Sequence, residues 1–192
     1  EPLGALDLKL RRQMQDELKA LQKRGGTAFV HVTHDQEEAM ALADHCVVMN
    51  DGRIEDSGPP ERVYARPATR FTATFMGEST LVPGRVAADD PARVETAMGP
   101  VSLPAALPAG SDVWLAIRPE HLRIGEEPGA LGLGTATVSE VVFQGSFKRL
   151  TAVSRADPSL AFIVRAPADA AVAPGGEIAL CCRAGDLVPL ER

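Results

Sequence analysis

The chain has 192 residues, enough for one ordinary domain or two small ones. Its formal net charge of −6 argues against general nucleic-acid binding, which needs a basic surface. No apolar run approaches the roughly 18 residues of a membrane-spanning helix, and the polar opening stretch is unlike a signal peptide. The three cysteines follow no metal-site or disulfide spacing, so we expect a protein of a reducing compartment.

The first predicted element is a helix that begins at Asp7. Leucine and methionine recur at helical spacing through residues 10–21, and Gly25 and Gly26 follow as a helix end. Asp7 itself is a residue type that caps helix N-termini. We therefore expect a helix from Asp7 to about Gly25.

His34 stands between two segments of different character. The preceding residues 27–32, TAFVHV, are short, apolar and β-rich, which predicts a strand. The following residues are rich in helix formers and carry Asp35 and Glu38 in capping-box spacing. His34 is therefore expected on a turn at the end of a strand, where α/β folds commonly bind ligands. Judged by position alone, the residue is more simply read as a locally hydrogen-bonded histidine at the start of a helix.

A β-hairpin and two short helices are predicted next. Residues 45–50 and 53–58 are strand-like and flank Asp51-Gly52, a strong hairpin signal. The two short helices follow at residues 59–65 and 68–76. This half of the chain is typical of the trailing part of a parallel α/β sheet.

The pattern changes after Gly77. Helical periodicity disappears, and short β-like runs alternate with proline and glycine turns. These runs lie at residues 80–87, 111–120, 136–154, 160–166 and 177–184. They predict a small β-barrel or sandwich, with Trp114, Phe143, Phe147 and Phe162 as core anchors.

Three stretches of the first half, taken in order, resemble the end of the ATP-binding subunit of ABC transporters. EPLGALD resembles the segment in which a Walker B strand runs into the D-loop, and VTHDQEEAMALAD resembles the switch-histidine segment. VVMNDGRIEDSGPPERVYARP resembles the strand, hairpin and helix that close the ATPase domain. The second half, with FMGE, IRPEHL and FQGSFKR, resembles the TOBE-type domain of importers of the maltose, polyamine and ferric-iron kind.

This resemblance implies a fold class and a division into domains. The fold expected is an α/β remnant of a P-loop ATPase domain followed by an all-β OB-like barrel of the TOBE type. Residues 1–77 would be the C-terminal part of the ATPase domain, and residues 78–192 the TOBE-type domain. Because Glu1 is not a plausible translation start, we expect the chain to be the C-terminal part of something longer.

The resemblance also implies roles for three residues. Glu1 falls on the catalytic carboxylate after Walker B, and His34 falls on the switch histidine that contacts the γ-phosphate. Asp7 falls on the D-loop aspartate, which reaches across the ATPase dimer. Such roles suit phosphoryl transfer, which depends on positioning and charge stabilisation. Gly4 departs from the family pattern, which commonly has serine there, so a D-loop side-chain contact is in doubt.

Other motifs of the family are missing from the chain. No G-x-x-x-x-G-K-[ST] phosphate loop, signature loop, Q-loop or Walker B metal ligand occurs. The resemblance therefore implies ATP and Mg²⁺ as cofactors of the full-length parent, an ABC-type transport ATPase. We expect this chain alone to bind neither and to be inactive, and we predict no metal site in it.

The implied partners are a second copy of the chain and transmembrane permease subunits, with no nucleic acid. The protein would then be cytoplasmic, held at the inner face of the cell membrane by the permease. The β half most resembles the polyamine and ferric-iron branch, where it would be regulatory and would stabilise a dimer. The alternative is a stand-alone OB-like module that binds a small ligand, for which the basic residues of FQGSFKR offer an anion site or only a solvated hairpin turn. The RPE stretch, residues 118–120, fits a strand-end ion pair as well as a functional site.

Overall fold

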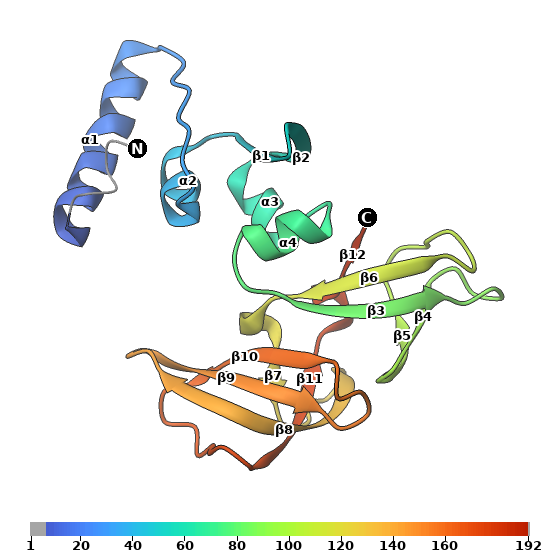
Figure 1. Ribbon diagram of the computed structural model, residues 1–192. Helices are drawn as coiled ribbons and strands as arrows, with labels where there is room; N and C mark the ends of the chain where they lie inside the picture. The colour runs from blue at the N-terminus through green and yellow to red at the C-terminus, as the bar shows by residue number, and fades with distance from the viewer. Residues whose placement is uncertain (1–6, 192) are drawn as a thin grey trace.

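The computed structural model describes residues 7–191 (Figure 1). The chain runs from a part made mostly of helices, residues 7–77, into a part made of strands, which begins near residue 80. This confirms the predicted fold class, a helix-containing N-terminal part followed by an all-β, OB-like part. Within residues 7–191 no helix combines the length and the apolar character needed to cross a bilayer.

Helix α1 (Leu8–Gly25) has the bounds that its local signals predict. The carboxylate of Asp7 caps its first turn by accepting the backbone N–H groups of Lys9 and Leu10. Gly26 ends the helix with a left-handed conformation, φ 59°, which favours glycine. The helix is thus specified by residues next to each other in the sequence.

The prediction of a strand at residues 27–32 is wrong. This segment has no regular secondary structure, and Phe29, Val30 and Val32 are 52%, 94% and 83% exposed. A strand needs a neighbour that pairs with its backbone N–H and C=O groups, and none of the sheets formed by the described residues includes this segment. The apolar, β-rich composition therefore could not produce a strand on its own.

A small helical unit follows. It consists of α2 (Gln36–Leu42), the hairpin of β1 (Cys46–Asn50) and β2 (Arg53–Gly58), α3 (Pro60–Ala65) and α4 (Arg70–Phe75). Asp51 and Gly52 form the hairpin turn with φ angles of 48° and 74°, as the Asp-Gly signal predicts. The unit has its own core of four buried residues, Cys46, Val48, Val63 and Met76.

The β part consists of two five-stranded antiparallel sheets (Figure 1). In spatial order the first sheet contains β12 (Val188–Leu190), β6 (Asp112–Ile117), β3 (Thr80–Val86), β4 (Arg93–Thr96) and β5 (Gly99–Ser102). The second contains β10 (Ala161–Pro167), β9 (Phe147–Ser154), β8 (Leu131–Phe143), β11 (Glu177–Cys182) and β7 (Arg123–Ile124). The 3₁₀ turns η1 (Pro119–His121) and η2 (Ala184–Asp186) each follow a strand, β6 and β11 respectively.

One apolar core joins the two sheets. Its largest fully buried side chains come from both of them: Leu115, Ile117, Leu133, Leu150, Phe162 and Leu180. Of the four predicted anchors, Phe162 is confirmed, whereas Phe143 is 65% exposed and does not belong to the core. Trp114 and Phe147 are half-buried. Successive strand residues face opposite sides of a sheet, and composition does not show which side faces the core.

Candidate functional site

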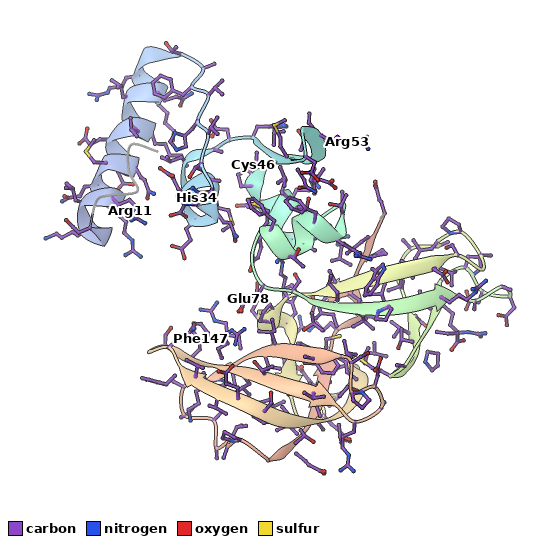
Figure 2. The ribbon with its side chains drawn as sticks, viewed as in Figure 1. Arg11, His34, Cys46, Arg53, Glu78 and Phe147 are labelled. Carbon is purple, nitrogen blue, oxygen red and sulfur yellow. The ribbon has the colours of Figure 1, made fainter. Side chains whose placement is uncertain are left out.

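The segment around His34 is the place where the sequence predicts catalysis. His34 is exposed and lies on a bend just before α2, so the structure puts it at the start of a helix as expected (Figure 2). Its neighbour Asp35 is the N-cap of α2 and accepts the backbone N–H of Glu38 at 3.1 Å. The local reading of this segment as a helix start is therefore confirmed.

The predicted capping box is only half formed. The backbone N–H of Asp35 donates to the hydroxyl of Thr33 at 3.0 Å instead of to the carboxylate of Glu38. That carboxylate is almost fully buried, 4% exposed, and accepts the Thr33 hydroxyl at 2.6 Å. Its other oxygen lies 3.1 Å from Nε2 of His31. The Glu38 carboxylate thus contacts the side chains of two residues that precede His34.

Thr33 and His31 were not predicted to belong to this site. The signal that could have found Thr33 is its position two residues before an N-cap, from which a threonine hydroxyl reaches backbone N–H groups. His31 lies in the segment that was expected to be a strand, and its contact with Glu38 depends on the irregular path of that segment. Sequence spacing does not reveal such a path.

Asp7 and His34 lie at the starts of two helices that contact each other. Asp7 caps α1, and Nη1 of Arg11 in the first turn of α1 lies 3.4 Å from a carboxylate oxygen of Asp35. Further along α1, the ammonium group of Lys19 donates to the carbonyl of Ala41 at 3.1 Å. The N-cap role of Asp7 is therefore observed, whereas Glu1 lies outside the described residues.

The basic residues of FQGSFKR are engaged in contacts within the protein. The ammonium group of Lys148 donates to the carbonyl of Ala170 at 2.7 Å. The guanidinium of Arg149 donates to both carboxylate oxygens of Glu78, at 2.8 and 3.1 Å through Nε. This hairpin therefore gives no support to an anion site.

The rest of the β part offers little reactive chemistry. A shallow hollow on the first sheet is lined by Trp114 among others. Its charged residues are already paired, Arg85 with Asp112 and Glu95 with Arg93. The cysteines are free and buried, and burial raises the pKa of Cys182 to about 12, which keeps this thiol protonated. Among residues 7–191 no group of histidine, cysteine and carboxylate side chains could hold a metal ion.

Comparisons with known proteins place these two parts in context. The family model of the TOBE domain matches residues 115–190. The spermidine/putrescine import ATP-binding protein PotA of Rubrobacter xylanophilus is 43% identical over 175 residues, which cover 87% of this chain and 42% of that protein. The sn-glycerol-3-phosphate import ATP-binding protein UgpC of Chromohalobacter salexigens is 49% identical over 142 residues, which cover 74% of this chain and 38% of that protein.

The chain thus spans about two fifths of the length of these relatives. Among solved structures, the cytoplasmic molybdate-binding protein ModG matches with a TM-score of 0.47 and 13% identity, over 58% of this chain and 95% of that one.

Proposed function

We propose that this chain is the C-terminal part of an ABC importer ATP-binding subunit and helps to couple ATP hydrolysis to import. It carries a TOBE domain at residues 115–190 and is homologous to the C-terminal regions of such subunits. The observation that carries this proposal is the extent of the match. The relative from Rubrobacter xylanophilus aligns with 87% of the chain, more than the TOBE domain alone could account for. A stand-alone ligand-binding module would not require the helical part.

In this proposal residues 1–77 complete an ATPase domain and residues 78–192 form its TOBE-type extension. Glu1 would polarise the attacking water, His34 would contact the γ-phosphate, and Asp7 would reach across the dimer of ATPase domains. The bonds that hold the backbone around His34, through Asp35 and Glu38, support the histidine role, because phosphoryl transfer depends on positioning. ATP and Mg²⁺ would be bound by the full-length protein, not by this chain.

The partners proposed are a second copy of the protein and transmembrane permease subunits, which would hold it at the cytoplasmic face of the membrane. The cargo proposed is a polyamine. Of the two cargo classes that the resemblance implies, polyamines and ferric iron, polyamines are the class found in the name of the relative from Rubrobacter xylanophilus. A glycerol phosphate importer subunit matches at 49% identity, so cargo choice is assigned to the permease and not to this region.

A chimera tests the proposed activity. The N-terminal part of the Rubrobacter xylanophilus relative, joined to this chain in place of its own C-terminal region, is expected to hydrolyse ATP. His34→Ala in the chimera should lower kcat about 10²- to 10³-fold, the usual effect of removing one preorganised donor to a developing charge. Phosphate release measured with saturating Mg-ATP gives the result.

His45→Ala is the matched control, because His45 is also exposed and its only described partner is the hydroxyl of Ser57 at 2.8 Å. This variant should keep its turnover, and the chain without the added N-terminal part should show none. Turnover by the isolated chain, or equal rates in the His34 and His45 variants, would contradict the proposed role.

A further inference from the structure

Arg118 is a buried cation that bridges the helical part and the β part. It follows β6 directly, and the residue is only 3% exposed. Its Nε and Nη2 both donate to the carbonyl of Tyr64, at 3.1 and 2.8 Å. Its Nη1 donates to the carbonyls of Ala73 and Glu78, at 2.9 and 3.0 Å. One side chain of the β part therefore binds three carbonyls of the chain that precedes it.

These carbonyls are well suited to a cation. Tyr64 lies in the last turn of α3 and Ala73 in the last turn of α4. The carbonyls of a last helical turn lack partners within the helix and carry the negative end of its dipole. The planar guanidinium presents donors in several fixed directions, which a lysine ammonium cannot do from one position. Arg118 thus completes the ends of two helices at once.

Tyr64 and Glu120 form the second half of the same contact. The Arg118 guanidinium lies 4.2 Å from the centre of the Tyr64 ring, and the Tyr64 hydroxyl donates to Oε1 of Glu120 at 2.7 Å. Burial, together with this hydrogen bond, raises the pKa of Tyr64 to about 12. The stretch RPE therefore contacts α3 with both of its charged residues.

Gly77 shows how closely the chain passes this contact. Its φ of 109° is one that L side chains rarely adopt. A Cβ atom there would lie 3.1 Å from the Tyr64 ring and 3.3 Å from Nη1 of Arg118. The connection between α4 and β3 is therefore packed against the Arg118 contact and is not a free linker.

Weaker contacts extend this junction. Arg149 on β9 pairs with Glu78 at 2.6 Å, and Arg70 on α4 lies 4.6 Å from the centre of the Trp114 ring on β6. Ala73 of α4 also packs with Ala116 and Leu190 of the first sheet. The Arg149–Glu78 ion pair is partly exposed and contributes little by itself. The buried guanidinium of Arg118 therefore makes the main polar contact between the two parts.

We infer that Arg118 is the positioning residue that holds α3 and α4 against the β part. Because β1 and β2 share a core and hydrogen bonds with these helices, residues 46–191 then move as one body, and any movement of the β part relative to the rest of the protein takes place N-terminal to β1. The connection at residues 77–79 then separates two patterns of sequence but is not a joint. This inference goes beyond the proposed activity and does not depend on it.

The junction can be followed spectroscopically, because Tyr64 is the only tyrosine of the chain and Trp114 the only tryptophan. At pH 11 a tyrosine with a pKa of about 12 is roughly one tenth ionised, and one with an ordinary pKa of about 10 roughly nine tenths. We expect Arg118→Met to raise the ionised fraction of Tyr64 at pH 11, read from tyrosinate absorbance, from roughly one tenth towards roughly nine tenths. Far-ultraviolet circular dichroism at the same pH is the check that the variant is still folded.

If Arg118 did not hold the junction together, its replacement would not raise the ionised fraction of Tyr64. The positive charge of Arg118 lowers the pKa of Tyr64, so its removal without opening the junction leaves the ionised fraction at pH 11 unchanged or smaller. That result would overturn the inference. Arg118→Lys, which keeps the charge but cannot reach all three carbonyls, should give an intermediate fraction, and it replaces the methionine variant if the latter does not fold.

A second measurement at neutral pH is independent of the titration. Thermal unfolding followed by tyrosine second-derivative absorbance, which reports on Tyr64 in α3, and by Trp114 fluorescence should coincide in the unmodified chain and separate in Arg118→Met, with the Tyr64 signal changing first. Arg85→Met is the matched control, since Arg85 lies on β3 in an exposed pair with Asp112. Coincident transitions in Arg118→Met would overturn the inference as well.

Discussion

Phe162→Ala is expected to lower the free energy of unfolding of the β part by about 3–5 kcal/mol, the usual range for a buried phenylalanine. Phe162 is fully buried on β10, in the core that joins the two sheets. Truncation removes the transfer free energy of the ring and leaves a cavity that the sheets can close only in part. Since domains are stable by about 5–15 kcal/mol, the variant should lose a large share of its stability. Urea unfolding monitored by Trp114 fluorescence measures the change.

Phe143→Ala is the control for this experiment. The residue is of the same type and also lies on a strand of the second sheet, but it is 65% exposed. Its truncation should change the unfolding free energy little. Equal losses in the two variants would contradict the assignment of Phe162 to the core and of Phe143 to the surface.

The second large effect is expected at Asp56, a buried carboxylate that holds the helical unit together. Its Oδ1 accepts the backbone N–H of Ser57 at 2.7 Å and Nη2 of Arg62 at 2.5 Å, and its Oδ2 accepts the backbone N–H of Ala68 at 2.8 Å. These bonds tie β2 to α3 and to Ala68, two residues before α4. Asp56→Asn places an amide donor against one of these donors, which should cost about 2–3 kcal/mol.

The pH dependence of this effect follows from the pKa of Asp56. Burial raises it, but the hydrogen bonds from Arg62, Ala68 and Ser57 outweigh burial and hold it below its usual value. A carboxyl group with a lowered pKa in the folded state stabilises the fold fully above its unfolded pKa of about 3.9. This contribution is lost as the pH falls through the folded pKa. The difference between Asp56→Asn and the unmodified chain should therefore be largest near neutral pH and shrink below about pH 4.

Unfolding in urea between pH 3 and pH 7, followed by helix circular dichroism, tests this dependence. Asp112→Asn is the control, because the side chain of Asp112 is 84% exposed and its pair with Arg85 is open to solvent. It should change stability little at any of these pH values. A difference for Asp56→Asn that does not vary with pH would show that its carboxylate charge plays no part.

Local signals in the sequence were sufficient for elements whose hydrogen bonds close within a few residues. Helix α1 begins after Asp7 and ends at Gly25 because an N-cap carboxylate and a left-handed glycine act on adjacent backbone groups. The hairpin of β1 and β2 turns at Asp51-Gly52 for a similar reason. The position of His34 at the start of α2 also follows from the N-cap Asp35 beside it. The resemblance to ABC importer subunits likewise rested on contiguous stretches.

Features that depend on distant partners were decided only by the tertiary structure. Residues 27–32 have the composition of a strand, but no strand lies beside them. Phe143 is of a residue type common in protein cores, but it lies on the exposed side of β8. The RPE stretch fitted a strand-end ion pair as well as a functional site. The role of Arg118 depends on carbonyls 40 to 54 residues earlier in the chain, which meet its guanidinium only when α3 and α4 pack against β6. Backbone carbonyls carry no sequence signal, so a side chain that binds them is recognised only in the folded protein.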